Sequence, residues 1–405
     1  MNKLASFALL FYLCFSCKNI NKSKHLEHFD LQEGLTLELT NAAFNKIKLK
    51  RSQALVEQFL YKSKDDYVHG HLSANDKKIR VKARLKGDFV DHLEGNRWSF
   101  RILTTDGGTV LNHQRISIHG IHTRAFVNEW VFHQLLSKEG IISLQYDFYP
   151  FSVNDTLAGI YALESYCDNH VLTLANRPLG PILKFNENDL WGNSKFKGQP
   201  NRDDLLMQEA RIKTCNKDWC KIDSNKSIVS QAKQLLNDYR LGKVSYHKIF
   251  DVTLWTKYVA INELMGSNHA LRWHNLRFYF NPESNKFEPI GFDSGSWMPK
   301  RKALYHYQQD TELFHQMMFT DSTYTDKIDG ILRRICERSY LSEFFAKNKL
   351  KIDSLETMAQ QEKENYKFTR NNYYHAQRRI LKHLMKRNLK VFDIPLFWSD
   401  IQPSL

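Results

Sequence analysis

The segment from residue 262 to residue 297 holds the densest set of side chains that could do chemistry. An apolar run that predicts a helix ends at Gly266, and a polar loop follows it as far as Asn275. An apolar and aromatic hairpin is then predicted, with Asp293 just after its second strand. Amide and carboxylate oxygens are hard ligands that suit Mg²⁺, and phosphoryl-transfer sites hold their metal through such a pair. The pattern predicts a metal site at Asn275 and Asp293.

Two side chains of this loop are candidates for a catalytic role. Asn268 and His269 lie upstream of Asn275, where a loop residue can orient an attacking group, and a histidine can act as a base near neutral pH. The segment 266–275 contains no Asp or Glu. The simpler interpretation is that Asn275 and Asp293 only cap and turn the hairpin, because Asp293-Ser-Gly is a good turn sequence by itself. The residues alone leave both interpretations open.

Hydrophobic periodicity predicts the elements that must position this loop. Short alternating segments between residues 35 and 111 predict an antiparallel sheet. A helix is expected over 124–137, and two further strands are expected at 146–153 and 157–164. The expected organisation is a signal sequence at 1–17, a tether at 18–33, a β-rich lobe at 34–185, a loop excursion at 186–226, and a helical lobe with the inserted hairpin at 227–405.

Three stretches resemble the CotH family, the spore-coat-type secreted protein kinases. Arg84-Leu-Lys-Gly, followed by Arg97-Trp-Ser-Phe-Arg101, resembles two basic strands of the family. Asn154-Asp-Thr-Leu-Ala-Gly-Ile-Tyr-Ala-Leu-Glu164 resembles its Asn-Gly-x-x-x-Gly-x-Tyr-x-x-x-Glu hairpin. The third stretch is 266–293, with a loop, an Asn before an apolar-aromatic strand, and an Asp after a second strand. The order and spacing of the three motifs carry the resemblance.

The resemblance implies a fold and a set of site residues. The fold would be α+β and atypical protein-kinase-like, with a β-rich N-terminal lobe and a helical C-terminal lobe. Asp293 would be the metal-binding aspartate, and Asn275 would share the metal with it. The residues implied for nucleotide binding are Arg84, Lys86, Arg97, Arg101, Glu164 and Lys184. Arg97 stands in for a Lys of the family and is not its geometric equivalent.

The function implied by the resemblance is that of a kinase. It would bind ATP and Mg²⁺ and transfer phosphate to a protein or to another acceptor at the cell surface. Active family members carry an Asp in the loop where this chain has none, and His269 could act as the base instead or could be a structural loop residue. Two alternatives stay open: a catalytically inactive scaffold or binding protein in cell-surface assembly, and another nucleotide-dependent transferase on the same fold.

The N-terminus predicts export. A lysine at position 3 precedes an apolar run from Leu4 to Phe15, which is too short to span a bilayer comfortably. Ser16-Cys17 resembles a bacterial lipoprotein cleavage site, with Cys17 as the lipidated first residue of the mature chain. The expected location is therefore the cell envelope, with a lipid anchor in the membrane, and the alternative is an ordinary secreted protein.

The charge balance points to an anionic partner. The chain has 58 Lys and Arg against 44 Asp and Glu, a formal net charge of +14. Such a balance suits nucleic acid, a membrane surface or a phosphate-bearing substrate, and the alternative is a generally basic, soluble surface with no anionic partner. For an exported protein we do not expect nucleic acid, and the motifs assign part of the charge to a nucleotide cleft.

Four cysteines follow the signal region. Cys215 and Cys220 could form a disulfide around a small loop outside the cytoplasm. Cys167 and Cys336 could pair or could be two buried free thiols. The sequence does not decide between these arrangements.

Two further groups are expected to have no binding role. His113, His119 and His122 are expected in a surface loop, because no Cys or acid stands beside them at the spacing of a metal site. The basic and aromatic stretch 366–387 is expected to be an amphipathic helix with its apolar face on the core and its basic face in solvent.

Overall fold

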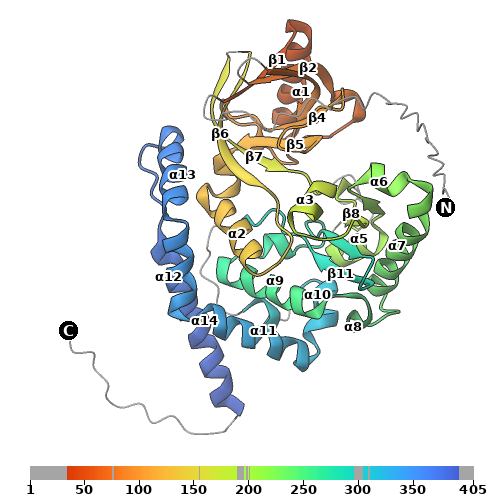
Figure 1. The fold of residues 1–405 in the computed structure, drawn as a ribbon, viewed down its shortest axis with the longest axis vertical. Helices are drawn as coiled ribbons and strands as arrows, with labels where there is room; N and C mark the ends of the chain where they lie inside the picture. The colour runs from red at the N-terminus through yellow and green to blue at the C-terminus, as the bar shows by residue number, and fades with distance from the viewer. Residues whose placement is uncertain are drawn as a thin grey trace, which may run out of the picture.

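The computed structural model describes residues 34–74, 77–154, 156–188, 196, 197, 199, 201–295, 304–308 and 311–391. The signal sequence and tether expected at 1–33, including Cys17, lie outside the described residues. Figure 1 shows a β-barrel of N-terminal strands at the top, with most of the helices below it. No helix in the described part of the chain is both long enough and apolar enough to cross a membrane.

Seven strands form the barrel, in the order β1-β2-β3-β4-β5-β7-β6. The closing pair is β1 and β6, which run parallel with Leu37 opposite Val153, whereas the other neighbours are antiparallel. The expected alternation is confirmed most clearly in β3, where every second residue from Ile79 to Leu85 is buried. The strands are β1 (Leu35–Leu39), β2 (Val68–Ala74), β3 (Lys77–Leu85), β4 (Phe100–Thr104), β5 (Arg115–Gly120), β6 (Tyr146–Val153) and β7 (Leu157–Ser165).

The closed barrel contradicts the expected kinase-like fold. The structure is mixed α+β, with a strand-rich N-terminal part and a helical C-terminal part, as expected. The N-terminal strands, however, form a closed barrel and not a kinase-like lobe. Closure depends on the parallel pairing of Leu35–Leu37 with Phe151–Val153. These segments are far apart in the chain, and alternation within each strand does not reveal their pairing.

The barrel has an apolar core of its own. Leu37, Leu72, Val81 and Phe100 are fully buried in it. The helix α1 (Asn41–Glu57) packs against the barrel through a few apolar residues such as Phe44. A filled barrel of this size leaves no room for a ligand along its axis, so a binding site must lie outside it.

A second sheet of four strands has the order β11-β10-β8-β9. The hairpin expected at 276–292 is confirmed by β10 and β11, with Phe280 opposite Phe287. Gly291 N–H donates to the carbonyl of Ile142, which ties the chain after β11 to the segment before β6. The strands are β8 (Ile182–Phe185), β9 (Ile212–Thr214), β10 (Phe278–Asn281) and β11 (Lys286–Pro289).

Helices pack around this second sheet and share the larger apolar core. The buried helix α9 lies at the centre, with Trp255, Val259 and Leu264 fully buried. Two 3-10 turns matter for the site, η4 (Ile121–Arg124) and η6 (His269–Leu271). The α-helices other than α1 are α2 (Val127–Lys138), α3 (Asn169–Leu174), α5 (Arg202–Glu209), α6 (Lys217–Lys221), α7 (Lys226–Arg240), α8 (Tyr246–Ile249), α9 (Val252–Met265), α10 (Leu313–Phe319), α11 (Ser322–Ile335), α12 (Arg338–Lys347), α13 (Lys349–Glu362) and α14 (Arg370–Val391).

Two C-terminal expectations have different outcomes. The amphipathic helix expected at 366–387 is confirmed by α14, which buries Ile380 and Leu384. The segment 186–226, expected as a loop excursion, contains α5, β9 and α6. Its polar composition hides short elements that each bury only a few residues, such as Leu206 and Met207 on α5.

Candidate active site

A cavity of about 390 Å³ lies where the barrel meets the loops around the second sheet. Among the described residues that line it, eight are Lys or Arg and four are Asp or Glu. A concave surface with this surplus of positive charge attracts anions. The basic residues are Lys62, Arg84, Lys86, Arg101, Arg115, Arg124, Lys184 and Arg277, and the acidic residues are Asp88, Asp91, Glu187 and Asp293.

A row of polar side chains crosses four neighbouring strands of the barrel. Arg84 of β3 lies opposite Arg101 of β4. Arg101 lies opposite Ser117 of β5, which in turn lies opposite Glu164 of β7. Residues directly opposite one another share a face of the sheet, and two like charges in that position are destabilising. The Arg84–Arg101 pair is therefore unfavourable on its own, and an anion near both would offset the repulsion.

Arg101 lines the cavity and has side-chain donors without a partner in the described part of the chain. Its side chain is buried, and Nε and Nη1 have no hydrogen-bond partner among the described residues. The guanidinium lies 5.4 Å from the centre of the Tyr166 ring. Burial, with a further contribution from Arg115, lowers the pKa of Arg101 to about 10. Arg101 is thus charged at neutral pH, and its free N–H groups suit a phosphate oxygen.

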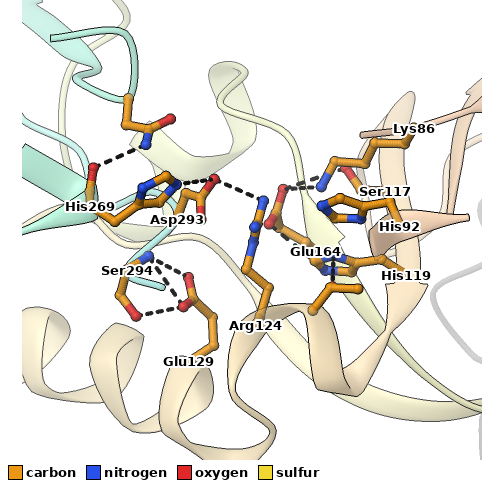
Figure 2. Close-up of polar contacts among 12 residues, drawn as sticks. Lys86, His92, Ser117, His119, Arg124, Glu129, Glu164, His269, Asp293 and Ser294 are labelled. Atoms are coloured by element: carbon orange, nitrogen blue, oxygen red, sulfur yellow. Dashed lines mark hydrogen bonds and ion pairs between the residues drawn. The ribbon is translucent and has the colours of Figure 1, made fainter. Parts of the chain in front are cut away.

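Lys86 and Glu164 form a buried pair beside this row. Lys86 Nζ lies 3.5 Å from Glu164 Oε1, and Ser117 Oγ donates to the same oxygen at 3.4 Å (Figure 2). The chain turns after Lys86 at Gly87, whose φ of +114° strongly favours glycine. Burial lowers the pKa of Lys86 to about 8, although Glu164 acts in the opposite direction. Lys86 is charged at pH 7 and loses its charge in mildly alkaline solution.

Arg124 connects the two sides of the cavity. Figure 2 shows its guanidinium between Asp293 and Glu164, and its Nη2 lies 2.9 Å from Asp293 Oδ2. Burial raises the pKa of Asp293, but Arg124 and then His269 lower it by more, so the pKa lies well below its usual range. The backbone beside this pair is strained: Asp293 has a φ of +54°, and Ala125 and Phe126, which follow Arg124, have φ values of +54° and +55°. Strain of this kind gathers at functional sites.

His269 lies at the outer side of Asp293. Its Nε2 is 3.5 Å from Asp293 Oδ2, and about half of its side chain is exposed. The charge of Asp293 raises the pKa of His269, against the effect of burial. His269 therefore lies between the buried carboxylate and solvent, with its protonated form favoured by Asp293.

The fit of Asp293 and Asn275 to a metal can be tested on their remaining atoms. Asp293 Oδ1 is buried and has no hydrogen-bond partner among the described residues, which is costly for a charged oxygen. Asn275 is buried and lines the cavity, and its Nδ2 donates to the carbonyl of His269 at 3.0 Å, so its Oδ1 remains as a ligand atom. Within the described ranges no group of three or more His, Cys, Asp or Glu side chains could hold a metal. Mg²⁺ commonly uses one or two protein ligands together with phosphate oxygens and water, so this pair fits Mg²⁺.

A buried glutamate from α2 holds the turn that carries Asp293. Glu129 accepts hydrogen bonds from Ser294 N at 3.1 and 3.2 Å and from Ser294 Oγ at 2.6 Å. On the other side of the turn, Ser267 Oγ donates to the carbonyl of Ser294. Glu129 itself has no exposed surface. This carboxylate therefore positions Asp293 through the backbone of the next residue (Figure 2).

Most of the residues predicted for the site come together in the structure. Glu164 does not line the cavity but forms an ion pair with Lys86, which does. Asn268 is not among the described lining residues either. Its carbonyl accepts a hydrogen bond from Leu271 N, which shapes the η6 turn. Cys17 lies outside the described residues. The predicted residues that line the cavity are Arg84, Lys86, Arg101, Lys184, His269, Asn275 and Asp293.

Arg97 is directed elsewhere. Its Nε lies 2.5 Å from Glu362 Oε2, and its Nη2 donates to Glu362 Oε1 at 3.1 Å. Glu362 at the end of α13 also accepts from Ile160 N at 2.6 Å. A Cβ on Gly159 would lie 2.3 Å from the Arg97 guanidinium, so the glycine of the 154–164 motif makes room for this pair. Arg97 thus fastens α13 to the barrel and does not line the cavity.

Several residues of the site escaped the sequence. Arg124, Arg115 and Glu129 belong to no motif, and Arg277 lies within the 266–293 stretch but was not singled out. For the arginines the only available signal was the general excess of Lys and Arg.

The surface-loop prediction is wrong for two of the histidines. His113 and His119 are both fully buried. His119 Nε2 lies 3.9 Å from Glu164 Oε2, and burial, with Lys86 and Arg124 adding to it, lowers the pKa of His119 well below its usual value. His119 is thus a neutral ring packed behind the charged row. His113 forms hydrogen bonds to Asp168 at 3.0 Å and to Gln145 at 2.7 Å.

Comparison with known proteins adds no relatives. No protein-family model matches the chain, and no curated protein matches it. The function proposed below therefore rests on the residues and geometry of the cavity.

The Arg97–Glu362 contact generates a stability prediction. Arg97→Ala leaves the partly buried Glu362 without its cation, and we expect a loss of about 1–3 kcal/mol in the free energy of unfolding. Glu362→Gln keeps an acceptor for Ile160 N and should cost less. Urea unfolding measures both losses. Because Arg97 is not in the cavity, anion binding by the Arg97→Ala protein should equal that of the wild type, and a large loss of binding would contradict this placement.

The Glu129–Ser294 contact generates a second prediction. Glu129→Leu removes the acceptor used by two donors of Ser294 and should cost about 1–3 kcal/mol in unfolding free energy. The same change should weaken Mg²⁺-dependent binding at Asp293, because the turn is no longer held. Glu129→Gln retains one acceptor oxygen and should lie between wild type and Glu129→Leu in both measurements. Equal binding by all three proteins would show that Glu129 does not position Asp293.

Proposed function

We propose that the protein is an exported, CotH-like phosphotransferase that binds ATP with Mg²⁺ and transfers phosphate to a hydroxyl of a protein or surface polymer. The observation that carries the proposal is the pairing of two features in one cavity. One is the surplus of Lys and Arg with unused donors, and the other is the buried, unpartnered Oδ1 of Asp293. An anion alone needs only the first feature. A metal-bound polyphosphate needs both.

The basic side chains supply the sites for phosphate oxygens. Arg101 offers two unused donors, and Arg84 lies directly opposite it in the sheet. Lys86 reaches the same region as a point charge held by Glu164. Lys184, from the second sheet, is paired with Glu187 at 3.1 Å and faces the cavity from the other side. The negative charge of a triphosphate bound among these groups would offset the positive charge of the Lys and Arg side chains.

Asn275 and Asp293 are the residues that would hold Mg²⁺ in this proposal. The metal would neutralise charge that builds up on the transferred phosphoryl group. Arg124 forms its ion pair with Oδ2 of Asp293, so Oδ1 remains available to bind the metal. His269 reaches both Asp293 and solvent, so the acceptor hydroxyl would approach from its side. An unprotonated His269 could take the proton of that hydroxyl.

A catalytically inactive binding protein is the second candidate. The loop 266–275 has no acid that could orient an acceptor hydroxyl, and Asp293 raises the pKa of His269, which disfavours the unprotonated ring needed for a base. A protein with this site could bind a nucleotide firmly without transferring phosphate. Binding and turnover must therefore be measured separately.

The first test is calorimetric titration of the purified chain with ATP in the presence and absence of Mg²⁺. We expect binding that depends on Mg²⁺, and we expect Asp293→Asn to lose that dependence. Arg101→Met should weaken binding about 10- to 100-fold, as expected for loss of charge-assisted hydrogen bonds. Asp106→Asn is the matched control, because Asp106 is an exposed acid paired with Arg80 outside the cavity. Absence of nucleotide binding by the wild type would refute the proposal.

Transfer is then followed with ATP labelled on its γ-phosphate. Release or transfer of label by the wild type, and its loss in His269→Ala with binding retained, supports the phosphotransferase. Firm binding with no release of label by the wild type supports the binding protein instead.

The pKa of Lys86 predicts how binding depends on pH. A lysine binds phosphate in its protonated form, and a pKa of about 8 means that this form is lost as the pH rises through 8. We expect the affinity for ATP–Mg²⁺ to fall about tenfold between pH 7 and pH 9. Lys86→Arg keeps its charge over this range, so its affinity should change little. An equal decline in both proteins would assign the pH dependence to another group.

A further inference from the structure

Two cysteines lie together at the edge of the cavity. Cys167 follows β7 of the barrel and lines the cavity, whereas Cys215 follows β9 of the second sheet. Both are buried in one small apolar cluster with Leu144, Ile182 and others. Cys215 is held in place by its backbone N–H, which donates to the carbonyl of Ile182 at 2.7 Å.

The surroundings of the pair favour a reactive thiolate. Interaction with the Cys167 thiol lowers the pKa of Cys215, although burial opposes it, and Arg277 and Lys184 contribute further. Burial raises the pKa of Cys167, so this thiol keeps the proton that the pair shares. A thiolate is the form that attacks a disulfide.

We propose that Cys167 and Cys215 form a disulfide that fastens the barrel to the second sheet beside the cavity. The two side chains are packed in the same small buried cluster, and Cys167 can be reached from the cavity. The chain is expected to be exported, and disulfides form and persist outside the cytoplasm. The inference concerns a covalent modification and does not depend on phosphate transfer.

The reaction balances with a low-molecular-weight disulfide, RSSR, as the oxidant. One sulfur of the pair attacks as a thiolate, and the RS–SR bond breaks to leave a mixed disulfide and RS⁻. The other sulfur gives its proton to RS⁻ and attacks the mixed disulfide, which releases a second RS⁻. The pair loses two electrons and one shared proton, and the products are the protein disulfide, RSH and RS⁻.

The other two cysteines are poorer partners. Cys220 Sγ donates to Asn216 Oδ1 at 3.3 Å, and burial raises the pKa of the Cys220 thiol to about 11. Cys336 belongs to the larger core around the helices and not to the cluster of Cys167, and burial raises its pKa to about 12. All four thiols are free in the structure. The pairings weighed from the sequence, Cys215–Cys220 and Cys167–Cys336, are thus less favourable than Cys167–Cys215.

The test is to equilibrate the full chain with glutathione and glutathione disulfide, alkylate the remaining thiols, and map the peptides by mass spectrometry. Tryptic cleavage after Lys217 separates Cys215 from Cys220, so the two possible partners of Cys167 are distinguished. We expect one cross-linked peptide pair that contains Cys167 and Cys215, with Cys220 and Cys336 alkylated. We also expect the oxidised protein to unfold about 5 °C higher than the reduced protein.

Variants complete the experiment. Cys167→Ser and Cys215→Ser should each abolish the cross-link and the shift in unfolding temperature, whereas Cys220→Ser and Cys336→Ser should leave both. A Cys215–Cys220 cross-link, or alkylation of all four thiols under oxidising conditions, would overturn the proposal. Neither readout uses a nucleotide, so the result is independent of whether the cavity binds ATP.

Discussion

The ion pair between Arg124 and Asp293 is the contact on which the cavity depends. Arg124 ends the 3-10 turn after β5, and Asp293 follows β11 of the second sheet, so the pair joins the two sheets of the molecule. Both groups are buried. A buried charge left without its partner costs several kcal/mol, so loss of either residue would destabilise the contact. The backbone has positive φ at Asp293 and at Ala125 and Phe126, the two residues that follow Arg124.

The local parts of this arrangement could be predicted from the sequence, and its long-range part could not. The hairpin and the positions of Asn275 and Asp293 follow from hydrophobic pattern within one segment. Arg124 could not be found in that way, because nothing near it in the chain is chemically unusual. The same limit explains the error in the fold: strands such as β1 and β3 alternate as expected, but the pairing of β1 with β6 that closes the barrel is set by packing between distant segments.

Arg97 and Arg101 show that even two residues of one motif can have different roles that the sequence does not reveal. Both belong to one short basic motif, and the sequence treats them alike. Arg101 stands within β4, where its register opposite Arg84 and Ser117 directs it to the cavity. Arg97 precedes the strand and meets Glu362 of α13, which arrives from the far end of the chain. Residue type limits what each arginine can bind, but the neighbour that distant packing supplies decides its role.

Several polar groups of the cavity have no partner within the described part of the protein, and this costs stability. Arg84 opposite Arg101, the unused donors of Arg101, and the unpartnered Oδ1 of Asp293 all destabilise the protein in the absence of a ligand. A structural network would satisfy these groups internally, as the Glu129–Ser294 contact does a short distance away. Unsatisfied groups of both signs in one cavity suit the ligand proposed above, a polyphosphate with its cation. A ligand that binds only the folded state would also stabilise that state.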